Sequence, residues 1–587
     1  MPPTPRPQRY ANAALFEKNG TTRIPQNSRD LMPDMIVRLR LDIGELSAES
    51  QVENPTAFPA DKLPPDIDLD VMVSSTDLGV AVDGEALKSA RPSIAHGHFF
   101  LPGDGGPART RDRSPHLSFF LKLPPDELLW HGKISHARIG YYYRNILIQS
   151  QRLTIHPGEN TTFTIVTDFT TSDDLTGFDA IPERPRLSIL TNANGNGNHQ
   201  IVLRTPNQTT AASSATFELN SATVGTTIKK LRATLSMRAP EKKLRSTAMF
   251  AEDLRQLAPI GRELYNQLPG QIPPRFFGDI RNSPQDYVIQ IARPTTSGFV
   301  LPWSYIYEIP LYSDVTPTLC PMVAKWDGAK PLFEGVPREC PCGPHNRDVL
   351  CPFGFWGFRY AIEQLSSTDK PTISVPAAAN CDVVIGETRY GVDPVVLNKH
   401  VERLRATLAG MTGAVQLREG KDKASIETLL GADLPFVYFF CHGERLNIAD
   451  PNTYLGVGNR EKITAGDFIG WTGEWYDSLH KQIWDAVRPL VFINACHALA
   501  IEPETLVSYL DAFVGRGCAS GVIGTEVKVE QGMAMDVAEN FVAAWMSGKS
   551  TVEEALRAIR IDYLKQGNLF GLVYTPYCWS ELKIARQ

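Results

Sequence analysis

Two short segments of the chain each place a thiol beside an imidazole, directly after an apolar run. One is Tyr-Phe-Phe-Cys-His-Gly-Glu, with Cys441, His442 and Gly443, and the other is Val-Phe-Ile-Asn-Ala-Cys-His, with Cys496 and His497. A histidine can take the proton of a nearby thiol, and the thiolate that results can attack an acyl carbon. The imidazolium can then protonate the leaving amine. These residue types predict amide hydrolysis through a thioester.

Strand geometry decides which thiol meets which imidazole. Neighbouring residues of a strand point to opposite faces, so Cys441 and His442 diverge, as do Cys496 and His497. We therefore pair His442, as the base, with Cys496, as the nucleophile, and interpret Cys441 and His497 as structural. Gly443 has no side chain, so its backbone N–H can approach a developing oxyanion.

The elements around these segments alternate between strand and helix from about residue 381 onward. Continuous apolar strands that alternate with helices predict a mostly parallel sheet flanked by helices on both faces. In such a sheet the carboxyl ends of the strands form the crevice where chemistry collects. The predicted strands are 382–386, 414–417, 436–440, 490–495 and 521–524, and the predicted helices are 395–408, 424–430, 478–487, 503–514, 532–547 and 551–565.

The N-terminal part has a different rhythm. Residues 1–34 form a Pro-rich arm, and 35–150 and 151–245 carry short runs of period two between turn signals, which predicts two sandwich-like β domains. An Asn-Gly-rich turn near residues 191–198 predicts a hairpin. Residues 246–380 form a further region that begins with a helix, which Pro259 should kink or break, and continues with strands at 286–291 and 298–306. Residues 381–587 form the α/β domain.

A cysteine-rich segment precedes the α/β domain. We take Cys320, Cys340, Cys342 and Cys351 as candidate metal ligands, with His345 beside them. Thiols and an imidazole near prolines are typical of a tetrahedral structural zinc site, although the spacing matches none of the standard ligand pairs. The alternative is a loop of buried or idle thiols, and both interpretations stay open.

Composition limits the class of protein. The 587 residues are 42% hydrophobic and 21% charged with a net charge of −6, as in folded globular proteins, and nine cysteines is an odd number for a disulfide framework. No basic run is interleaved with aromatic residues, so nucleic acid is not an expected direct partner. We find no secretory signal and no apolar stretch long enough to span a membrane, and we expect a cytoplasmic protein.

The motifs Tyr-Phe-Phe-Cys-His-Gly, Val-Phe-Ile-Asn-Ala-Cys and Gly-Val-Ile-Gly-Thr-Glu resemble those of the CHAT domain, a caspase-like and separase-like cysteine peptidase of bacteria. His442 precedes Cys496 by about 50 residues, as in caspases. Val300-Leu-Pro-Trp-Ser and the aromatic stretch from Pro352 also resemble segments that accompany CHAT domains. The resemblance covers roughly 246–587.

The resemblance implies a caspase-like fold for the C-terminal domain and an endopeptidase that needs no cofactor, with His442 as base, Cys496 as nucleophile and Gly443 as oxyanion donor. It also implies a protein substrate, an activating or sensor protein partner that acts through the N-terminal region, and a role in bacterial defence. Asn494 occupies the position that often lines the first specificity pocket. Asp382 and Glu526 are acidic candidates for a basic-substrate pocket, against the interpretation that they are solvated carboxylates at strand ends.

Three other functions compete with this hypothesis. A catalytically silent caspase-like scaffold would keep His442 and Cys496 as relics. A zinc-containing protein-binding module would make the cysteine-rich segment the functional part. A serine hydrolase is disfavoured because the chain lacks a Gly-X-Ser-X-Gly elbow.

Overall fold

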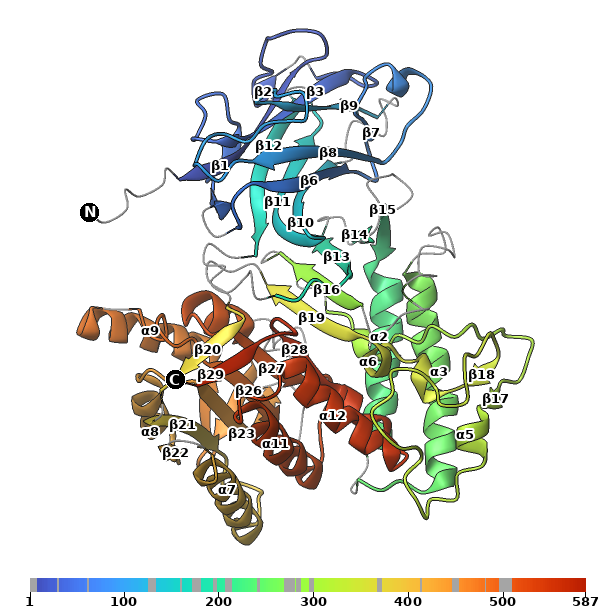
Figure 1. Ribbon diagram of the computed structural model, residues 1–587, viewed down its shortest axis with the longest axis vertical. Helices are drawn as coiled ribbons and strands as arrows, with labels where there is room; N and C mark the ends of the chain where they lie inside the picture. The colour runs from blue at the N-terminus through green and yellow to red at the C-terminus, as the bar shows by residue number, and fades with distance from the viewer. Residues whose placement is uncertain are drawn as a thin grey trace.

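The computed structural model describes residues 8–28, 31–60, 63–124, 134–158, 161–171, 181–193, 198–205, 214–239, 243–268, 280, 287–294, 300–366, 372–378, 380–411, 414–445, 453–480, 482–495 and 509–586. Figure 1 shows the N-terminal strands in blue at the top, a further sheet with green helices below them, and the red and brown C-terminal elements at the bottom. None of the described helices combines the length and the apolar character that a membrane crossing requires.

Two antiparallel sheets form the N-terminal part. The first has the order β5 (Ala57–Phe58), β1 (Arg9–Glu17), β3 (Ile36–Gly44), β9 (Leu117–Lys122) and β7 (Gly79–Ala81). The second has the order β2 (Asn27–Ser28), β12 (Thr161–Thr170), β11 (Ile146–His156), β10 (Ser135–Tyr143), β6 (Ile67–Ser74) and β8 (Ile94–Leu101), with β4 (Val52–Glu53) beside β12 in parallel.

These two sheets pack face to face. The rings of Phe58 in the first and Tyr141 in the second meet edge to face at 5.8 Å, and the Gln151 amide donates to the carbonyl of Ala11 at 2.6 Å. Alternate residues of β3 are fully buried, as expected for strands with one face in a core. Strand β1 lies inside the segment that the sequence suggested was a Pro-rich arm, and pairing with β3 and β5 orders it.

A third sheet has the order β15 (Ser214–Asn220), β14 (Asn198–Arg204), β13 (Arg186–Ala193), β16 (Val288–Arg293) and β19 (Ala361–Ser366). The predicted hairpin corresponds to β13 and β14, which pair antiparallel, and β13, β16 and β19 are parallel. The sheet thus joins strands from two predicted regions, 151–245 and 246–380.

Helices α2 (Ser221–Arg238) and α3 (Thr247–Gln267) pack against each other beside this sheet. Helix α3 runs through Pro259 without a break, so of the expected kink or break the break does not occur. Residues 300–306 form a turn with the 3-10 helix η6 (Trp303–Tyr305) in place of the predicted strand.

Short elements follow in the cysteine-rich and aromatic segments. They are β17 (Thr318–Leu319), α5 (Pro321–Ala324), β18 (Val349–Leu350), η7 (Pro352–Gly354) and α6 (Trp356–Arg359), and farther along β20 (Ser374–Ala377), which pairs in parallel with the C-terminal β29 (Lys583–Arg586).

The C-terminal sheet confirms the predicted fold class. Its order is β22 (Ala414–Gly420), β21 (Asn380–Glu387), β23 (Phe436–Arg445), β26 (Leu490–Ala495), β27 (Gly521–Thr525) and β28 (Tyr574–Tyr577), with β24 (Thr453–Val457) and β25 (Glu461–Thr464) attached to β23. All neighbours from β22 to β27 are parallel, and only the pair of β27 with β28 along this path is antiparallel.

Helices cover both faces of this sheet. One layer contains α7 (Pro394–Ala409), α11 (Gln531–Trp545) and α12 (Val552–Lys565), which is followed by η9 (Leu569–Val573), and the other contains α8 (Lys423–Leu430), α9 (Ala465–Leu479) and the π-helical turn η8 (Asp511–Arg516). Side chains alternate between the layers along each central strand. In β23, Phe436, Tyr438 and Phe440 face the first layer, and Val437, Phe439 and Cys441 face the second.

Candidate functional site

The carboxyl ends of β23 and β26 lie side by side in the C-terminal sheet. The parallel pairing of these strands runs from Phe436 opposite Leu490 to Cys441 opposite Ala495. From His442 onward, β23 leaves the parallel sheet and pairs antiparallel with β24, with His442 opposite Gly456 and Gly443 opposite Leu455. The strand therefore extends farther than predicted, and His442 is the first residue after the parallel pairing ends.

The proposed dyad is described only in part. The backbones of His442 and Gly443 belong to β23. Cys496 directly follows Ala495, the last residue of β26, but Cys496 and His497 lie outside the described residues. The roles of His442, Gly443 and Cys496 remain predictions.

Cys441 is fully buried among apolar side chains on the α8 and α9 face of the sheet, together with Phe439 and Ile493. A buried, apolar position favours the neutral thiol over the thiolate. This placement agrees with a structural role for Cys441.

Asn494 is also fully buried, on the opposite face of the sheet. Its amide group donates to the carbonyl of Ala534 in α11 at 2.6 Å, and its amide oxygen accepts from the Tyr574 hydroxyl at 3.1 Å. Tyr438 Oη lies 3.4 Å from the same amide nitrogen. These bonds hold the end of β26 against α11 and β28, and they favour a structural role for Asn494 over a substrate contact.

The two acidic candidates lie at opposite ends of the sheet. Asp382 is near the amino end of β21, where its exposed carboxylate pairs with Arg418 at 3.0 Å. Because Glu387 in the same strand lies opposite Phe440, Asp382 is about seven residues, or roughly 23 Å, from the level of His442. This position does not favour contact with a substrate at the dyad.

Glu526 directly follows β27, at the same edge as the end of β26. Its carboxylate is buried, accepts a hydrogen bond from Thr575 at 2.9 Å and lies 3.7 Å from the Arg232 guanidinium of α2. Glu526 is therefore close to the predicted site but already has partners. The contact with Arg232 joins residues far apart in the sequence, and no sequence pattern signals it.

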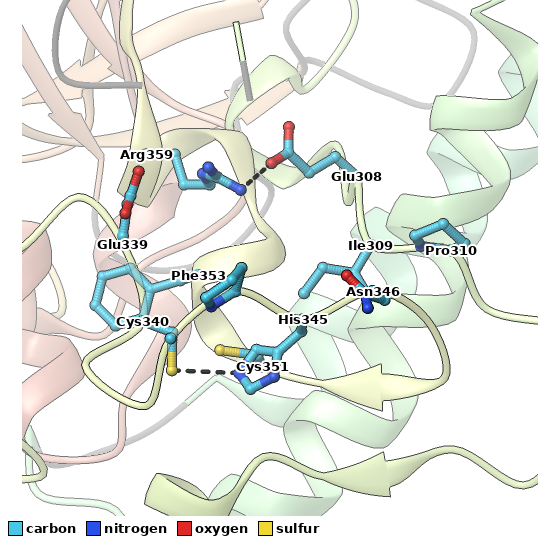
Figure 2. Close-up of a pocket in the computed structure, with 12 residues that line it drawn as sticks. Glu308, Ile309, Pro310, Glu339, Cys340, His345, Asn346, Cys351, Phe353 and Arg359 are labelled. Carbon is cyan, nitrogen blue, oxygen red and sulfur yellow. Dashed lines mark hydrogen bonds and ion pairs between the residues drawn. The ribbon is translucent and has the colours of Figure 1, made fainter. Parts of the chain in front are cut away.

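A second cluster of reactive side chains lies in the cysteine-rich segment. The ligand atoms of Cys320, Cys340, His345 and Cys351 all lie within 4.8 Å of one another. Three thiols and an imidazole at this spacing are a set that can hold a metal ion. Figure 2 shows His345 Nε2 pointing to Cys340 Sγ at 3.3 Å, with Cys351 beside them. Cys342, which the sequence-based set contained, is exposed, and His345 takes the fourth place in the cluster.

The crowding of the thiols affects their ionisation. Hydrogen bonds from Cys340 and then Cys351 lower the pKa of the Cys320 thiol. Burial raises the pKa of Cys351 well above its ordinary value, and the hydrogen bonds that it gives to Cys320 and Cys340 act in the same direction. The thiol groups are thus close enough to affect one another's ionisation.

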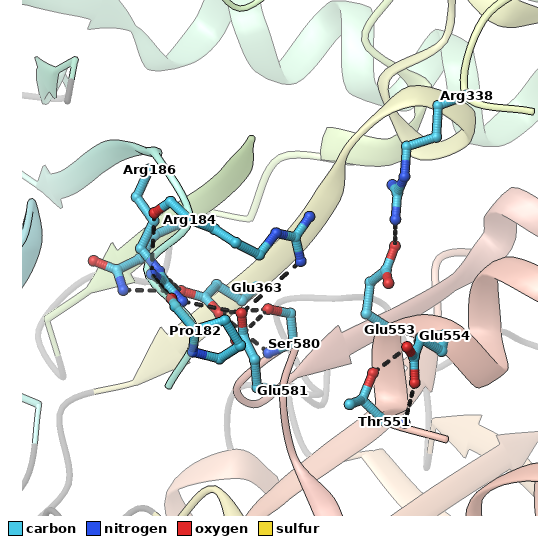
Figure 3. Close-up of polar contacts among 11 residues, drawn as sticks. Pro182, Arg184, Arg186, Arg338, Glu363, Thr551, Glu553, Glu554, Ser580 and Glu581 are labelled. Atoms are coloured by element: carbon cyan, nitrogen blue, oxygen red, sulfur yellow. Dashed lines mark hydrogen bonds and ion pairs between the residues drawn. The ribbon is translucent and has the colours of Figure 1, made fainter. Parts of the chain in front are cut away.

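A buried polar junction links the third sheet to the C-terminal end of the chain (Figure 3). The Glu363 carboxylate of β19 accepts hydrogen bonds from Gln290 at 2.9 Å and from the amide and hydroxyl of Ser580 at 3.1 and 2.9 Å. Arg186 of β13 lies 3.5 Å from Glu363 and 3.0 Å from Glu581. Burial and the Glu363 charge raise the pKa of Glu581, while Arg186 lowers it.

Comparison with known proteins gives one sequence relative. No family model matches the chain. The chain is 29% identical over 358 residues to a protein described as a "Probable protease" from Vitiosangium sp. (strain GDMCC 1.1324). The match covers 58% of this chain and 45% of that relative, so this chain spans less than half of the relative's length.

Two solved structures align at low similarity. The Saccharomyces cerevisiae separase–securin complex aligns with a TM-score of 0.34 and 9% identity, over 68% of this chain and 30% of that one. The Arg-specific cysteine proteinase gingipain R aligns with a TM-score of 0.30 and 10% identity, over 59% of this chain and 79% of that one. Scores this low establish no residue correspondence.

Proposed function

We propose that this chain is a cysteine endopeptidase of the caspase-like, CHAT-domain type, with His442 as general base and Cys496 as nucleophile. The observation that carries the proposal is the register of β23 and β26, which pairs Cys441 with Ala495. In the sequence, His442 directly follows Cys441, and Cys496 directly follows Ala495. This register supports the pairing of His442 with Cys496 that the two motifs predict.

The alternation of side chains supports the same pairing. In β23 and β26 the described even-numbered positions Tyr438, Phe440 and Phe492 face the α7 and α11 layer, as does Asn494 through its bond to α11. By sequence parity His442 and Cys496 are the next even-numbered positions, whereas Cys441 belongs to the opposite face. Cys441 is therefore a poor alternative nucleophile.

The proposed reaction uses the protein's own groups and no cofactor. His442 takes the Cys496 proton, and the thiolate attacks the scissile carbonyl carbon. The Gly443 N–H donates to the oxyanion, and the imidazolium returns the proton to the amine as the C–N bond breaks. Water then hydrolyses the thioester and releases the free carboxylate.

We propose a cytoplasmic enzyme that cleaves a protein substrate in a bacterial defence pathway. The description of its relative as a "Probable protease" supports the proteolytic part of this proposal. Of the predicted specificity residues, Glu526 is the one whose described position beside the end of β26 fits a basic side chain of the substrate. In the described structure the Arg232 guanidinium lies next to that carboxylate.

We propose that a partner or signal acts through the N-terminal region, and a chain of contacts supports this. The backbone N–H of Leu147 in β11 donates to the Gln290 side chain of β16 at 3.1 Å, and Gln290 donates to Glu363. Helix α2, which follows the third sheet's strand β15, carries the Arg232 that meets Glu526. Movement of the N-terminal sandwich would thus act on residues beside the catalytic edge.

Alkylation of Cys496 tests the dyad independently of the substrate. A free thiol is only a few per cent ionised at neutral pH, so a histidine partner should speed labelling by iodoacetamide by about tenfold or more. We expect His442→Ala to remove this advantage and the matched variant His497→Ala to keep it, with labelled peptides identified by mass spectrometry. Equal rates in all three proteins would refute the pairing and favour a silent scaffold.

A further inference from the structure

The Cys320, Cys340, His345 and Cys351 cluster is assembled by a very small parallel ladder. Strands β17 and β18 contain two residues each, and the pair of Leu319 with Leu350 lies immediately before Cys320 and Cys351. The Cys320 N–H donates to the carbonyl of Leu350 at 3.0 Å. The ladder thus presents two fully buried thiols from the same end.

Such a ladder needs another source of stability. Parallel strands normally belong to larger buried sheets, and two short strands alone are marginal in water. Residues 325–348, all of which the structure describes, contain no helix or strand. The segment between the two strands is thus a long connection whose ends are joined only by a marginally stable ladder.

The donor set fits one zinc ion. Zinc binds thiolate sulfur at about 2.3 Å and imidazole nitrogen at about 2.0 Å, so donors at the corners of the tetrahedron are roughly 3.5 Å apart. The four described atoms all lie within 4.8 Å of one another, close to this spacing. Four protein ligands leave no open coordination position, which is typical of a structural site.

The backbone explains why the fourth ligand is His345. Gly343 adopts a φ of +91°, which turns the chain between Cys340 and His345 so that both side chains meet. Cys342 lies on the exposed side of this turn. Figure 2 shows Cys340, His345 and Cys351 together on the wall of a cavity of about 400 Å³ that Glu308, Phe353 and Arg359 also line.

The same loop contacts the catalytic domain. Arg338 pairs with Glu553 of α12 at 2.6 Å, as Figure 3 shows, and Arg557 donates to the carbonyls of Val336 and Pro337 at 3.2 and 2.6 Å. The backbone of Leu332 donates to the carbonyl of Lys565 at 2.8 Å. A change in the conformation of this loop would therefore alter the contacts at the surface of α12.

We propose that Cys320, Cys340, His345 and Cys351 bind one Zn²⁺ as a closed structural site that clamps residues 325–348 against α12. The ion cross-links the end of the β17–β18 ladder to Cys340 and His345, near the C-terminal end of the loop. This site is separate from the proposed hydrolysis and takes no part in its chemistry.

Metal analysis of the purified full-length protein tests the proposal. After growth with zinc and gel filtration, we expect about one zinc and little iron per chain. Loss of one ligand in Cys340→Ser or His345→Asn should lower zinc affinity by more than about 100-fold, since even the partners that orient ligands contribute 10- to 100-fold. Cys342→Ser is the matched control and should keep its zinc.

Several results would overturn the site. Wild-type protein without zinc after growth and dialysis with Zn²⁺ would refute it, and this result does not depend on any variant folding. Iron in place of zinc would refute the assigned metal. Loss of zinc in Cys342→Ser together with retention in His345→Asn would refute the assigned ligands.

Limited trypsin digestion tests the clamp. Chelation of zinc from wild-type protein should speed cleavage after Lys325, Arg338 and Arg347. The control variant Cys342→Ser, with its zinc bound, should be as resistant to trypsin as the zinc-bound wild type. Equal digestion rates with and without zinc would show that the ion does not order the loop, and would refute the clamp. Cysteine-dependent peptidase activity is not needed for either readout, so failure of the zinc site and failure of the proposed function are distinguishable.

Discussion

The Glu363 junction provides a quantitative test of how the third sheet is joined to the C-terminal end of the chain. Glu363→Gln keeps the shape of the side chain but removes its charge. In the native protein, one carboxylate oxygen accepts from Gln290 and faces Arg186, and the other accepts from the amide and hydroxyl of Ser580. The glutamine amide of this variant can accept hydrogen bonds through its oxygen only. Its NH₂ group must therefore face the donors either of Gln290 and Arg186 or of Ser580.

The cost follows from these contacts. About two hydrogen bonds to a charged acceptor are lost, each worth roughly 1.5 kcal/mol or more, so the free energy of unfolding should fall by about 3 kcal/mol. This is the lower end of the 3–5 kcal/mol range for a broken buried ion pair, because Arg186 keeps Glu581 as a partner.

Thermal and urea unfolding of the full-length protein measure the change. Because a chain with several sheets need not unfold in one step, circular dichroism and tryptophan fluorescence should be followed together. Glu85→Gln is the control, since Glu85 is exposed and its pairs with Lys18 and Lys88 should contribute little to stability. If Glu363→Gln destabilises no more than Glu85→Gln, the junction does not hold the two parts together.

Three further variants test local features of the structure. Tyr574→Phe leaves the buried amide oxygen of Asn494 without its hydroxyl donor and should cost about 1–3 kcal/mol in urea unfolding; a neutral effect would contradict the assigned bond. Thr551→Ala removes the N-cap of α12, whose capping box with Glu554 appears in Figure 3, and should cost about 1 kcal/mol by the same assay, whereas an unchanged midpoint would argue against the cap. Burial, then Arg204, lowers the pKa of His96 to about 4, with His98 acting in the same direction and Asp70 against it. Because the unfolded imidazole has a pKa near 6.5, the unfolded state binds more protons between these values, and stability should fall as the pH drops from about 6.5 to 4. His96→Phe should show a weaker loss of melting temperature from pH 7 to pH 5, and an equal loss would refute this assignment.

Five strands of the C-terminal sheet were predictable because each contains a run of mostly apolar residues. The prediction for 490–495 matches β26 at both ends, and those for β21, β22 and β27 lie within the observed strands. A buried strand covered on both faces leaves a strong local signal, since every position must be apolar. The same signal located His442 at the end of a run.

Elements fixed by tertiary contacts were not predictable in the same way. Helix α9 contains Gly466, Gly470 and Gly473, which disfavour a helix locally, although its capping box of Thr464 and Asp467 was a usable signal. Helix α2 is rich in Ser and Thr and has little amphipathic character, so its sequence resembles the β region around it. Helix α2 packs against the next helix, α3, and α9 packs against η8, which lies beyond β26 in the sequence.

The roles of His442 and Cys496 stay predictions, and their surroundings could not be predicted from the sequence. Residue types and strand ends were enough to select His442 and Cys496. Which acidic residues lie near them depends on strand order and direction, which place Glu526 at the carboxyl edge and Asp382 at the amino edge. The choice of His345 over Cys342 depends on the turn at Gly343, a single backbone angle.

The central claim is cysteine-dependent proteolysis, and one measurement tests it most directly. Purified wild-type protein and its Cys496→Ala and Cys441→Ala variants are incubated with lysate of the native host, with and without the products of neighbouring genes. New protein N-termini are then compared by mass spectrometry. We expect new termini with the wild-type and Cys441→Ala proteins and none with Cys496→Ala. Cleavage that survives Cys496→Ala, or no cleavage under any condition from a protein whose Cys496 also fails to label, would contradict the proposed peptidase.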